Sequence, residues 1–257
     1  MPTINITDLS LEQFISGMGS LIFVIFSITI GIKIFINYFI VKKKIGTKRK
    51  EFISVGLTWV FLSSAWWGGG FCFLSVLLFQ YAFETPLYIF LSISFIPFAL
   101  IFWLYSFFHL FLKKKLGLKK NNSLYAALIC CLIYWIFLII LLFYDYTLVG
   151  TYTLFQTRPA LLPLIFEIVA IFIAVITGCI FASQSMISDD KRIVWKGRFL
   201  LLGFLLFTIG AFLEVIISLN PIGLILVRLI LIISAFCYYL GFLLPKFIEK
   251  WLIKTNA

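Results

Sequence analysis

Seven long apolar runs make up most of this 257-residue chain and constrain its fold more than any other feature. A helix of roughly 20 residues crosses a hydrocarbon core of about 30 Å and pairs its backbone polar groups internally. The runs lie near residues 21–41, 52–79, 87–112, 123–144, 161–182, 199–219 and 221–245. We therefore expect an all-α polytopic membrane protein, with seven transmembrane helices in one domain that covers residues 1–257.

The composition of the chain excludes an ordinary soluble domain. Hydrophobic residues make up 63% of the sequence and charged residues 12%, with a mean hydropathy of +1.14. Soluble domains carry about 25% charged residues. The chain is thus expected to be a membrane protein.

Lysine and arginine cluster in alternate gaps between the apolar runs and give the chain a net charge of +11. These clusters fall within residues 42–50, 113–120, 191–198 and 246–254. Positively charged loops stay in the cytoplasm, so the N-terminus is expected outside and the C-terminus inside a cell membrane. Such loops bind anionic lipid headgroups, and their placement argues against nucleic acid as the partner.

The second apolar run contains three consecutive glycines, Gly68 to Gly70, after two tryptophans. Each glycine costs about 1 kcal/mol in a helix relative to alanine, so a break or kink at these glycines is one interpretation, with the region forming a cavity wall. The alternative is that the helix ends near Ala65 and residues 71–80 form a second short helix. The tryptophans would then lie in the outer aromatic belt.

The gap at 145–160 contains two short β-prone runs around Val149 and Gly150. This pattern suits a small hairpin that covers the outer mouth of the bundle. An irregular loop is the alternative.

Four ionisable residues interrupt the apolar runs: Lys33, Glu167, Glu214 and Arg228. Each costs roughly 2.5–3.5 kcal/mol near the bilayer centre, so all four are expected to face the bundle interior and seek partners. Such residues indicate a functional site by default, and fixed ion pairs that order helix packing are the alternative.

Depth in the membrane predicts which of these charges meet. Asn220 and Pro221 join the last two runs, so these runs should form a tight antiparallel hairpin. At 1.5 Å per residue, Glu214 and Arg228 lie about 9 and 12 Å from that turn. Neighbouring helices pack 8–10 Å apart, which is about the combined reach of the two side chains. The sequence thus predicts a buried pair between Glu214 and Arg228.

Glu167 lies at a comparable depth and has no cation of its own. It shares Arg228, is protonated through desolvation, or waits for a cationic ligand. Aromatic side chains lie at a similar level, and together they predict an outer-half ligand pocket. Its members are Trp66, Trp67, Glu167, Glu214 and Arg228.

Lys33 and Asn37 lie one helical turn apart at a deeper level of the first run. They are candidates for an ion path through the lower bundle. Their alternative role is structural, as hydrogen-bonding or snorkelling side chains.

Several activities lack the residues that they require. A retinal Schiff base needs a lysine in the seventh helix, and none lies between Pro221 and Pro245, so no cofactor is expected. The single histidine, His109, cannot form a catalytic zinc site, and no metal site is expected. Asp145 has no companion motif of an intramembrane aspartyl protease. We therefore expect no catalytic residues and no enzyme.

Short motifs in the second half resemble uncharacterised seven-helix membrane proteins of archaea, including Asgard lineages. The motifs are Thr177-Gly-Cys-Ile-Phe-Ala182, Lys196-Gly-Arg-Phe-Leu200, Arg228 and Tyr239-Leu-Gly-Phe-Leu-Leu-Pro245. The resemblance implies a seven-helix fold and no established activity. It is distantly similar to stand-alone versions of the seven-helix sensor regions of histidine kinases.

These observations favour a membrane sensor that binds a small or lipidic ligand and signals through a cytoplasmic partner or a homo-oligomer. An ion- or proton-coupled transporter or channel that uses the intramembrane charges is the alternative, and a structural scaffold is a third. A continuous polar lining would favour transport. A pocket sealed below by apolar side chains would favour sensing.

Overall fold

The computed structural model describes residues 4–45, 51–112, 122–216 and 221–254. Within these residues, seven helical segments are long and apolar enough to cross a membrane, which confirms an all-α, multi-pass architecture. Many of the basic residues used to assign orientation, such as Lys48 and Lys113, lie outside the described residues, as does Asn220 of the predicted turn.

The second and third spans are each made of several helical pieces, whereas the first span lies in one long helix. The first half of the chain comprises η1 (Ile6–Asp8), α1 (Leu11–Ile45), α2 (Glu51–Leu62), η2 (Ser63–Trp66), α3 (Trp67–Phe79), α4 (Thr85–Ile93), α5 (Ile96–Phe107) and η3 (Phe108–Leu112). The second half comprises α7 (Asn122–Tyr144), η4 (Tyr146–Leu148), β1 (Gly150–Thr153), β2 (Gln156–Pro159), α8 (Leu161–Met186), α9 (Lys191–Ile216), α10 (Pro221–Leu243) and α11 (Lys246–Lys254).

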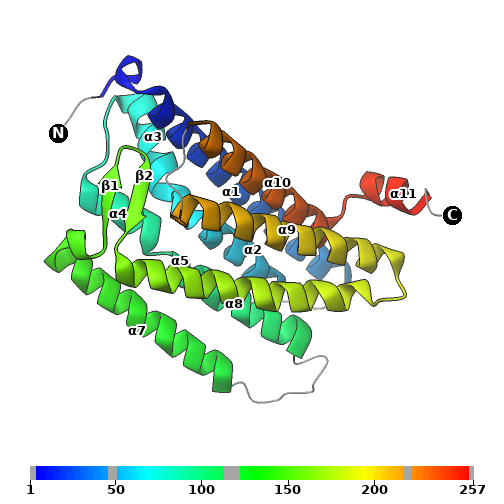
Figure 1. Cartoon of the computed structure of the whole chain (residues 1–257). Helices are drawn as coiled ribbons and strands as arrows, with labels where there is room; N and C mark the ends of the chain where they lie inside the picture. The colour runs from blue at the N-terminus through cyan, green and yellow to red at the C-terminus, as the bar shows by residue number, and fades with distance from the viewer. Residues whose placement is uncertain (1–3, 46–50, 113–121, 217–220, 255–257) are drawn as a thin grey trace.

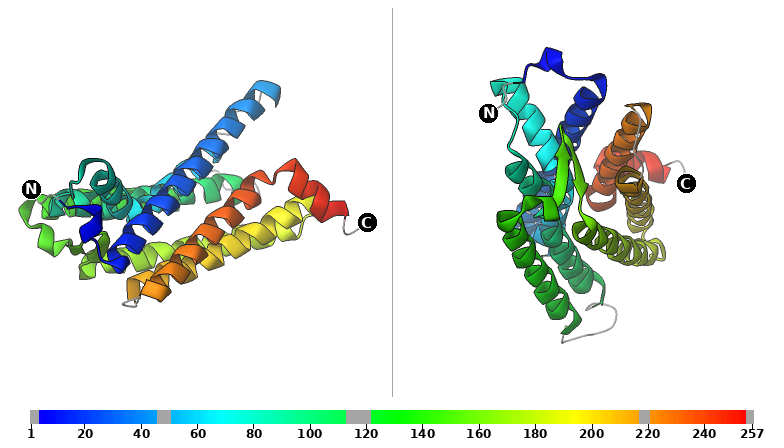
Figure 2. Two further views of the ribbon diagram at one scale, coloured as in Figure 1. Left: turned by 90° about the horizontal axis from the view of Figure 1, so that it is seen from above. Right: turned by 60° about the vertical axis from the view of Figure 1, so that its left-hand side comes forward.

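The long helices run roughly along one axis, with the β-hairpin across one end of the bundle (Figure 1). We call this the hairpin end. Helix α9 packs between α8 and α10, and α10 also contacts α1, which packs against α2 and α3. Helix α7 lies at the edge of the bundle against α5 (Figures 1 and 2). The hairpin thus contacts α1, α3, α4 and α8 at this end.

Small residues bring α9 and α10 into close contact. The Ser234 hydroxyl donates to the Gly203 carbonyl at 2.9 Å, which joins the two helices inside the core. A Cβ at Gly210 would lie 2.8 Å from the Leu231 side chain, so that position needs a glycine. This close packing holds the two helices that carry Glu214 and Arg228 side by side.

The second span breaks one turn before the glycines rather than at them. Residues Ser63–Trp66 form a 3-10 turn, and Gly68 to Gly70 lie in the first turn of α3. A Cβ at Gly68 would overlap Ser92 on α4, and one at Gly70 would lie 3.1 Å from the Leu21 backbone on α1. The glycines therefore allow close helix packing, while the preceding 3-10 turn supplies the break.

The gap at 145–160 forms the expected hairpin, with its turn at Leu154 and Phe155 rather than at Val149 and Gly150. Gly150 pairs with Pro159 and Thr153 with Gln156 in antiparallel register. Phe155 has a left-handed φ of 67° and is buried, with its ring 5.4 Å from the Phe73 ring on α3. The Ser16 hydroxyl on α1 donates to the Phe155 carbonyl at 3.1 Å. The hairpin tip is thereby fixed between α1 and α3.

Candidate functional site

A cavity of about 400 Å³ lies inside the bundle beneath the hairpin. Its walls come from α1, α2, η2, α3, α4, α5, the hairpin, α8, α9 and α10. Residues 155–159 of the hairpin line it from above, and Trp59, Trp103, Phe204 and Tyr238 lie at its deep end. The cavity is therefore closed in part by a β-structure that also packs into the helix bundle.

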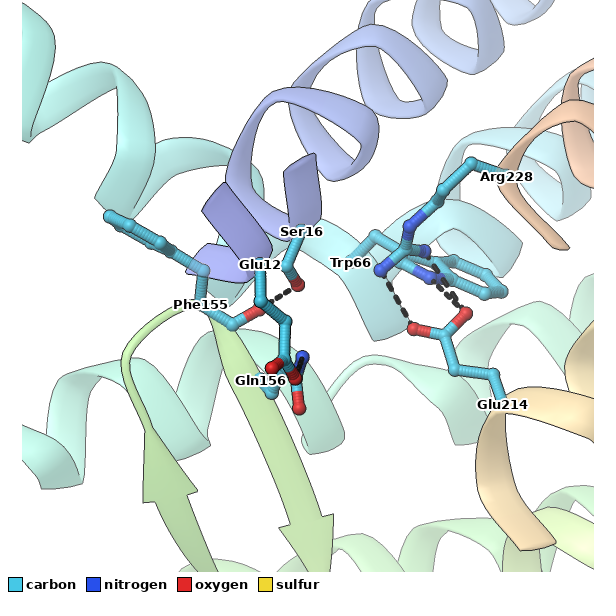
Figure 3. A network of polar contacts seen from close by, with 7 residues as sticks. All are labelled: Glu12, Ser16, Trp66, Phe155, Gln156, Glu214 and Arg228. Carbon is cyan, nitrogen blue, oxygen red and sulfur yellow. Dashed lines mark hydrogen bonds and ion pairs between the residues drawn. The ribbon is translucent and has the colours of Figure 1, made fainter. Parts of the chain in front are cut away.

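Glu214 and Arg228 form the predicted ion pair in the wall of this cavity (Figure 3). Arg228 Nη1 donates to Glu214 Oε2 at 3.0 Å, and Arg228 Nη2 donates to Glu214 Oε1 at 2.7 Å. This two-point geometry is the strongest arrangement for an arginine and a carboxylate. The prediction made from their matched depths is confirmed.

The two partners differ in how much of each side chain remains accessible. The Arg228 side chain is 5% exposed and that of Glu214 is 26% exposed. Gly19 on α1 makes room for the arginine, because a Cβ there would lie 2.8 Å from Arg228 Cγ. The guanidinium is thus covered, whereas part of the carboxylate remains open.

Trp66 completes the polar group around Glu214. Its indole Nε1 donates to Glu214 Oε2 at 3.0 Å, and Arg228 Cζ lies 5.9 Å from the centroid of its ring. Trp66 ends the 3-10 turn with φ −107° and ψ 0°, a backbone bend that turns its side chain toward α9 and α10. The broken second span therefore positions the indole that binds the carboxylate.

Glu167 enters the cavity from α8. It shares a helical stripe with Leu164, Ala170, Ile171 and Ala174, all of which line the cavity. The side chain is half-buried, and it makes no hydrogen bond or ion pair with the described residues. Tyr134 on α7, whose buried hydroxyl also has no hydrogen-bond partner, lies within electrostatic range of it. Glu167 is thus an unpartnered carboxyl at the cavity wall.

Aromatic rings form much of the remaining wall. The Trp59 and Tyr238 rings stack with centroids 4.0 Å apart, and the Trp103 and Phe204 rings lie 5.0 Å apart. Trp103 Nε1 donates to the Thr177 hydroxyl at 2.7 Å, which ties α5 to α8. The wall away from the charged residues is therefore largely aromatic and apolar.

Trp67 does not line the cavity, contrary to the predicted pocket. Its indole Nε1 donates to the Ser63 hydroxyl at 3.1 Å, and its ring contacts Phe61 and Phe95 on the opposite side of the span. Neighbouring residues in a helix point about 100° apart, and here Trp66 faces the cavity whereas Trp67 faces away from it.

Lys33 does not face the bundle interior, so that expectation is wrong. Its side chain is exposed, and its Nζ lies 5.1 Å from the centroid of the Tyr239 ring. A long side chain can satisfy its charge in this way along a helix surface. Neither Lys33 nor Asn37 lines the cavity, and the structure does not join them to Glu167, Glu214 and Arg228.

Apolar side chains close the cavity on the side away from the hairpin. One helical turn beyond the deep lining residues lie Val55, Phe107, Leu200 and Phe242 on four different helices. All four are buried and belong to one core cluster. The described residues thus show no continuous polar lining through the bundle.

The hairpin lining of the cavity could not be identified from the sequence pattern alone. Phe155 and Arg158 lie far along the chain from α1 and α3, and no local periodicity indicates that they fold back over the opening. Tyr88 and Ser92 on α4 also line the cavity. Their spacing of one helical turn shows that they share a face of α4, but it does not show that this face lines a cavity.

Clusters of potential metal ligands are absent from the described residues. No protein-family profile matches the chain, and no curated protein or solved structure matches it either. The chemistry of the cavity is therefore the basis for inferring what the protein does.

Proposed function

We propose that this protein is a seven-helix sensor whose cavity binds a small or lipidic ligand and whose opposite face signals to a cytoplasmic partner. The observation that carries the proposal is the cavity itself, which combines apolar aromatic walls with a few charged side chains. Ligand pockets have this composition, in which apolar surface supplies affinity and a few polar groups orient the ligand.

The closed inner side of the cavity supports sensing over transport. A transporter or channel would need polar groups or water along a path between the two membrane faces. In the part of the chain that the structure describes, Val55, Leu200 and Phe242 lie where such a path would run. The charged residues are gathered at the hairpin end, so they form a site rather than a pathway. An inert scaffold would not need such a cavity.

The orientation that we propose places the hairpin and the N-terminus outside the cell membrane and α11 in the cytoplasm. This assignment rests on the basic gaps of the sequence. Ligands would then reach the cavity from outside or from the outer leaflet, and basic residues would meet anionic headgroups inside.

Helix α10 provides a direct mechanical link between the site and the opposite end. It carries Arg228 in the cavity wall and continues through Leu244 and Pro245 into α11. Helix α11 in turn contacts α9 through an ion pair of 3.2 Å between Arg192 and Glu249. A ligand that shifts the Glu214 and Arg228 pair would therefore move the segment available to a partner subunit or protein.

A cavity-filling substitution tests the proposal. Ala99 lines the cavity and is buried, so Ala99→Phe should occupy it. Ala126 on α7 is exposed, and Ala126→Phe is the matched control. Full-length protein would be purified in native-lipid nanodiscs, and the bound compounds would be identified by mass spectrometry.

We expect a compound enriched with wild type and the control variant and depleted at least about tenfold with Ala99→Phe. The same compound added back should raise the thermal unfolding temperature of wild type and of Ala126→Phe, but not that of Ala99→Phe. Identical bound compounds in all three proteins would contradict a ligand-binding function for this cavity.

A further inference from the structure

We infer that the cavity selects a lipophilic cation, specifically a protonated amine attached to an apolar body. The inference rests on the proposed function and defines the ligand class of the same site. Its basis is the unequal accessibility of the charges that line the cavity.

The positive charge of Arg228 is paired with Glu214, and its remaining donor, Nε, is buried without a hydrogen-bond partner. Both of its terminal nitrogens donate to Glu214, and the side chain is 5% exposed. An anionic ligand would have to displace Glu214 to reach this guanidinium. Breaking a buried pair in this way leaves an uncompensated charge, which costs about 3–5 kcal/mol.

The negative groups, in contrast, remain available. Glu167 is half-buried at the cavity wall without an ion pair among the described residues, and Glu214 keeps 26% of its side chain exposed. An ammonium group can donate to the Glu167 carboxylate without disturbing the existing pair. It would also supply a partner to a carboxyl that makes no ion pair with the described residues.

The aromatic walls of the cavity suit the rest of such a ligand. Trp59, Trp66, Trp103 and Tyr88 all line the cavity. Aromatic faces attract cations as well as apolar groups, and the attraction grows when water is excluded. A neutral apolar ligand would use only the walls and would leave Glu167 desolvated.

Arg158 on the hairpin is the other cation at the cavity. Its side chain is exposed at the rim, where solvent and salt screen its charge. It should therefore slow the approach of a cation more than it weakens the bound state. Arg158→Gln is expected to raise the association rate of an amine, most clearly at low salt.

Three probes with one carbon skeleton test the inference. They are 4-phenylbutylamine, 4-phenylbutanol and 4-phenylbutyrate, which present a cation, a neutral group and an anion at pH 7. Binding would be measured by calorimetry with the full chain in nanodiscs of zwitterionic lipid, and empty nanodiscs would correct for partitioning. We expect the amine to bind about tenfold or more tightly than the alcohol, as befits a charge-assisted hydrogen bond.

Glu167→Gln should remove this preference, because a neutral amide forms no ion pair with an ammonium, so the amine and the alcohol should then bind with similar affinity. Glu84, an exposed carboxylate at the same end, gives the control Glu84→Gln, which should keep the full preference. Should Glu167→Gln not fold, the ranking of the probes on wild type decides the question, and Glu167→Asp serves as the second variant.

Equal affinity for the amine and the alcohol, or a preference that persists in Glu167→Gln, would overturn the inference. If all three probes bind wild type equally and Ala99→Phe abolishes this binding, the cavity still binds ligands and only the inferred charge selectivity is wrong. If no probe binds and Ala99→Phe leaves the co-purifying compounds unchanged, the proposed function fails as well.

Discussion

The Trp66 indole and the Glu214 carboxylate are joined by a hydrogen bond of 3.0 Å between Nε1 and Oε2. The same oxygen accepts from Arg228 Nη1, so an indole from the second span and a guanidinium from the seventh share one acceptor. This shared oxygen couples the 3-10 break of η2 to the α9 and α10 pair. A substitution of any one of these three side chains should therefore change the hydrogen bonding of the other two.

Loss of one partner of the ion pair should be far more damaging than loss of both. Arg228→Met leaves Glu214 without its cation and is expected to cost about 3–5 kcal/mol of unfolding free energy. The double variant with Glu214→Leu should cost much less. The unfolding free energy would be measured in mixed micelles for wild type, each single variant and the double variant. This double-mutant cycle gives the coupling energy of the two residues, and additive losses would contradict the ion pair.

The two neighbouring tryptophans should respond differently to the same substitution. Trp66→Phe removes a hydrogen bond to a charged group and should cost about 1.5–3 kcal/mol, whereas Trp67→Phe removes one to a neutral hydroxyl and should cost about 0.5–1.5 kcal/mol. Thermal unfolding in the same detergent compares them. Equal losses would mean that the Trp66 indole does not bind an ionised Glu214.

Gly19 should be required only because Arg228 is present. A Cβ at this position would lie 2.8 Å from Arg228 Cγ, so Gly19→Ala should cost about 1–3 kcal/mol by overpacking. The loss should largely disappear when Gly19→Ala is made in a protein that also carries Arg228→Ala and Glu214→Ala. If Gly19→Ala costs the same stability in that background, the loss comes from the backbone of α1 and not from contact with Arg228.

The hairpin should open more often when its contact with α1 is removed. Ser16→Ala deletes the hydrogen bond to the Phe155 carbonyl and should cost about 1 kcal/mol. Hydrogen exchange of residues 150–159 should then accelerate by about fivefold. Thr29→Ala, which removes a hydroxyl contact within α1, is the control and should leave hairpin exchange unchanged.

Lys33 should be dispensable for ligand binding. Its side chain lies outside the cavity beside Tyr239, so Lys33→Gln should not change the affinity for any of the three phenylbutyl probes. Calorimetry under the same conditions checks this. A loss of binding comparable to that of Ala99→Phe would instead indicate that α1 transmits a change from this position to the site.

The ion pair was predictable, and Trp66 and Glu167 also line the cavity as expected, whereas the outward direction of Trp67 was not predictable. The reason is geometric. Glu214 and Arg228 lie on consecutive helices, so helical rise alone fixes their relative depth. The direction of a side chain around a helix depends on where the helix bends, and the 3-10 turn at Ser63–Trp66 rotates Trp66 inward and Trp67 outward. Of the two interpretations of this span, the helix end near Ala65 agrees with the position of the 3-10 turn, whereas the break at Gly68 to Gly70 does not.

Long-range contacts were the other limit. The hydrogen bond between Ser16 and Phe155 joins residues 139 positions apart, and no local pattern in either segment specifies it. For Lys33, the cost of charge burial suggested an inward orientation, yet a flexible side chain beside an aromatic ring on the bundle surface avoids that cost. Energetic rules thus predicted which groups need partners better than they predicted where those partners lie.

The pairing of Glu214 with Arg228 also bears on how the chain enters the bilayer. The two residues lie on consecutive helices, α9 and α10, which pack closely along their length. If the two helices entered the bilayer separately, inserting the charge on each would cost about 2.5–3.5 kcal/mol. If they entered together as a helical hairpin, the two charges would already be paired. Biogenesis should therefore deliver the last two helices to the membrane together. A chain truncated after α9 would leave an uncompensated acid in the bilayer and be a target for membrane quality control.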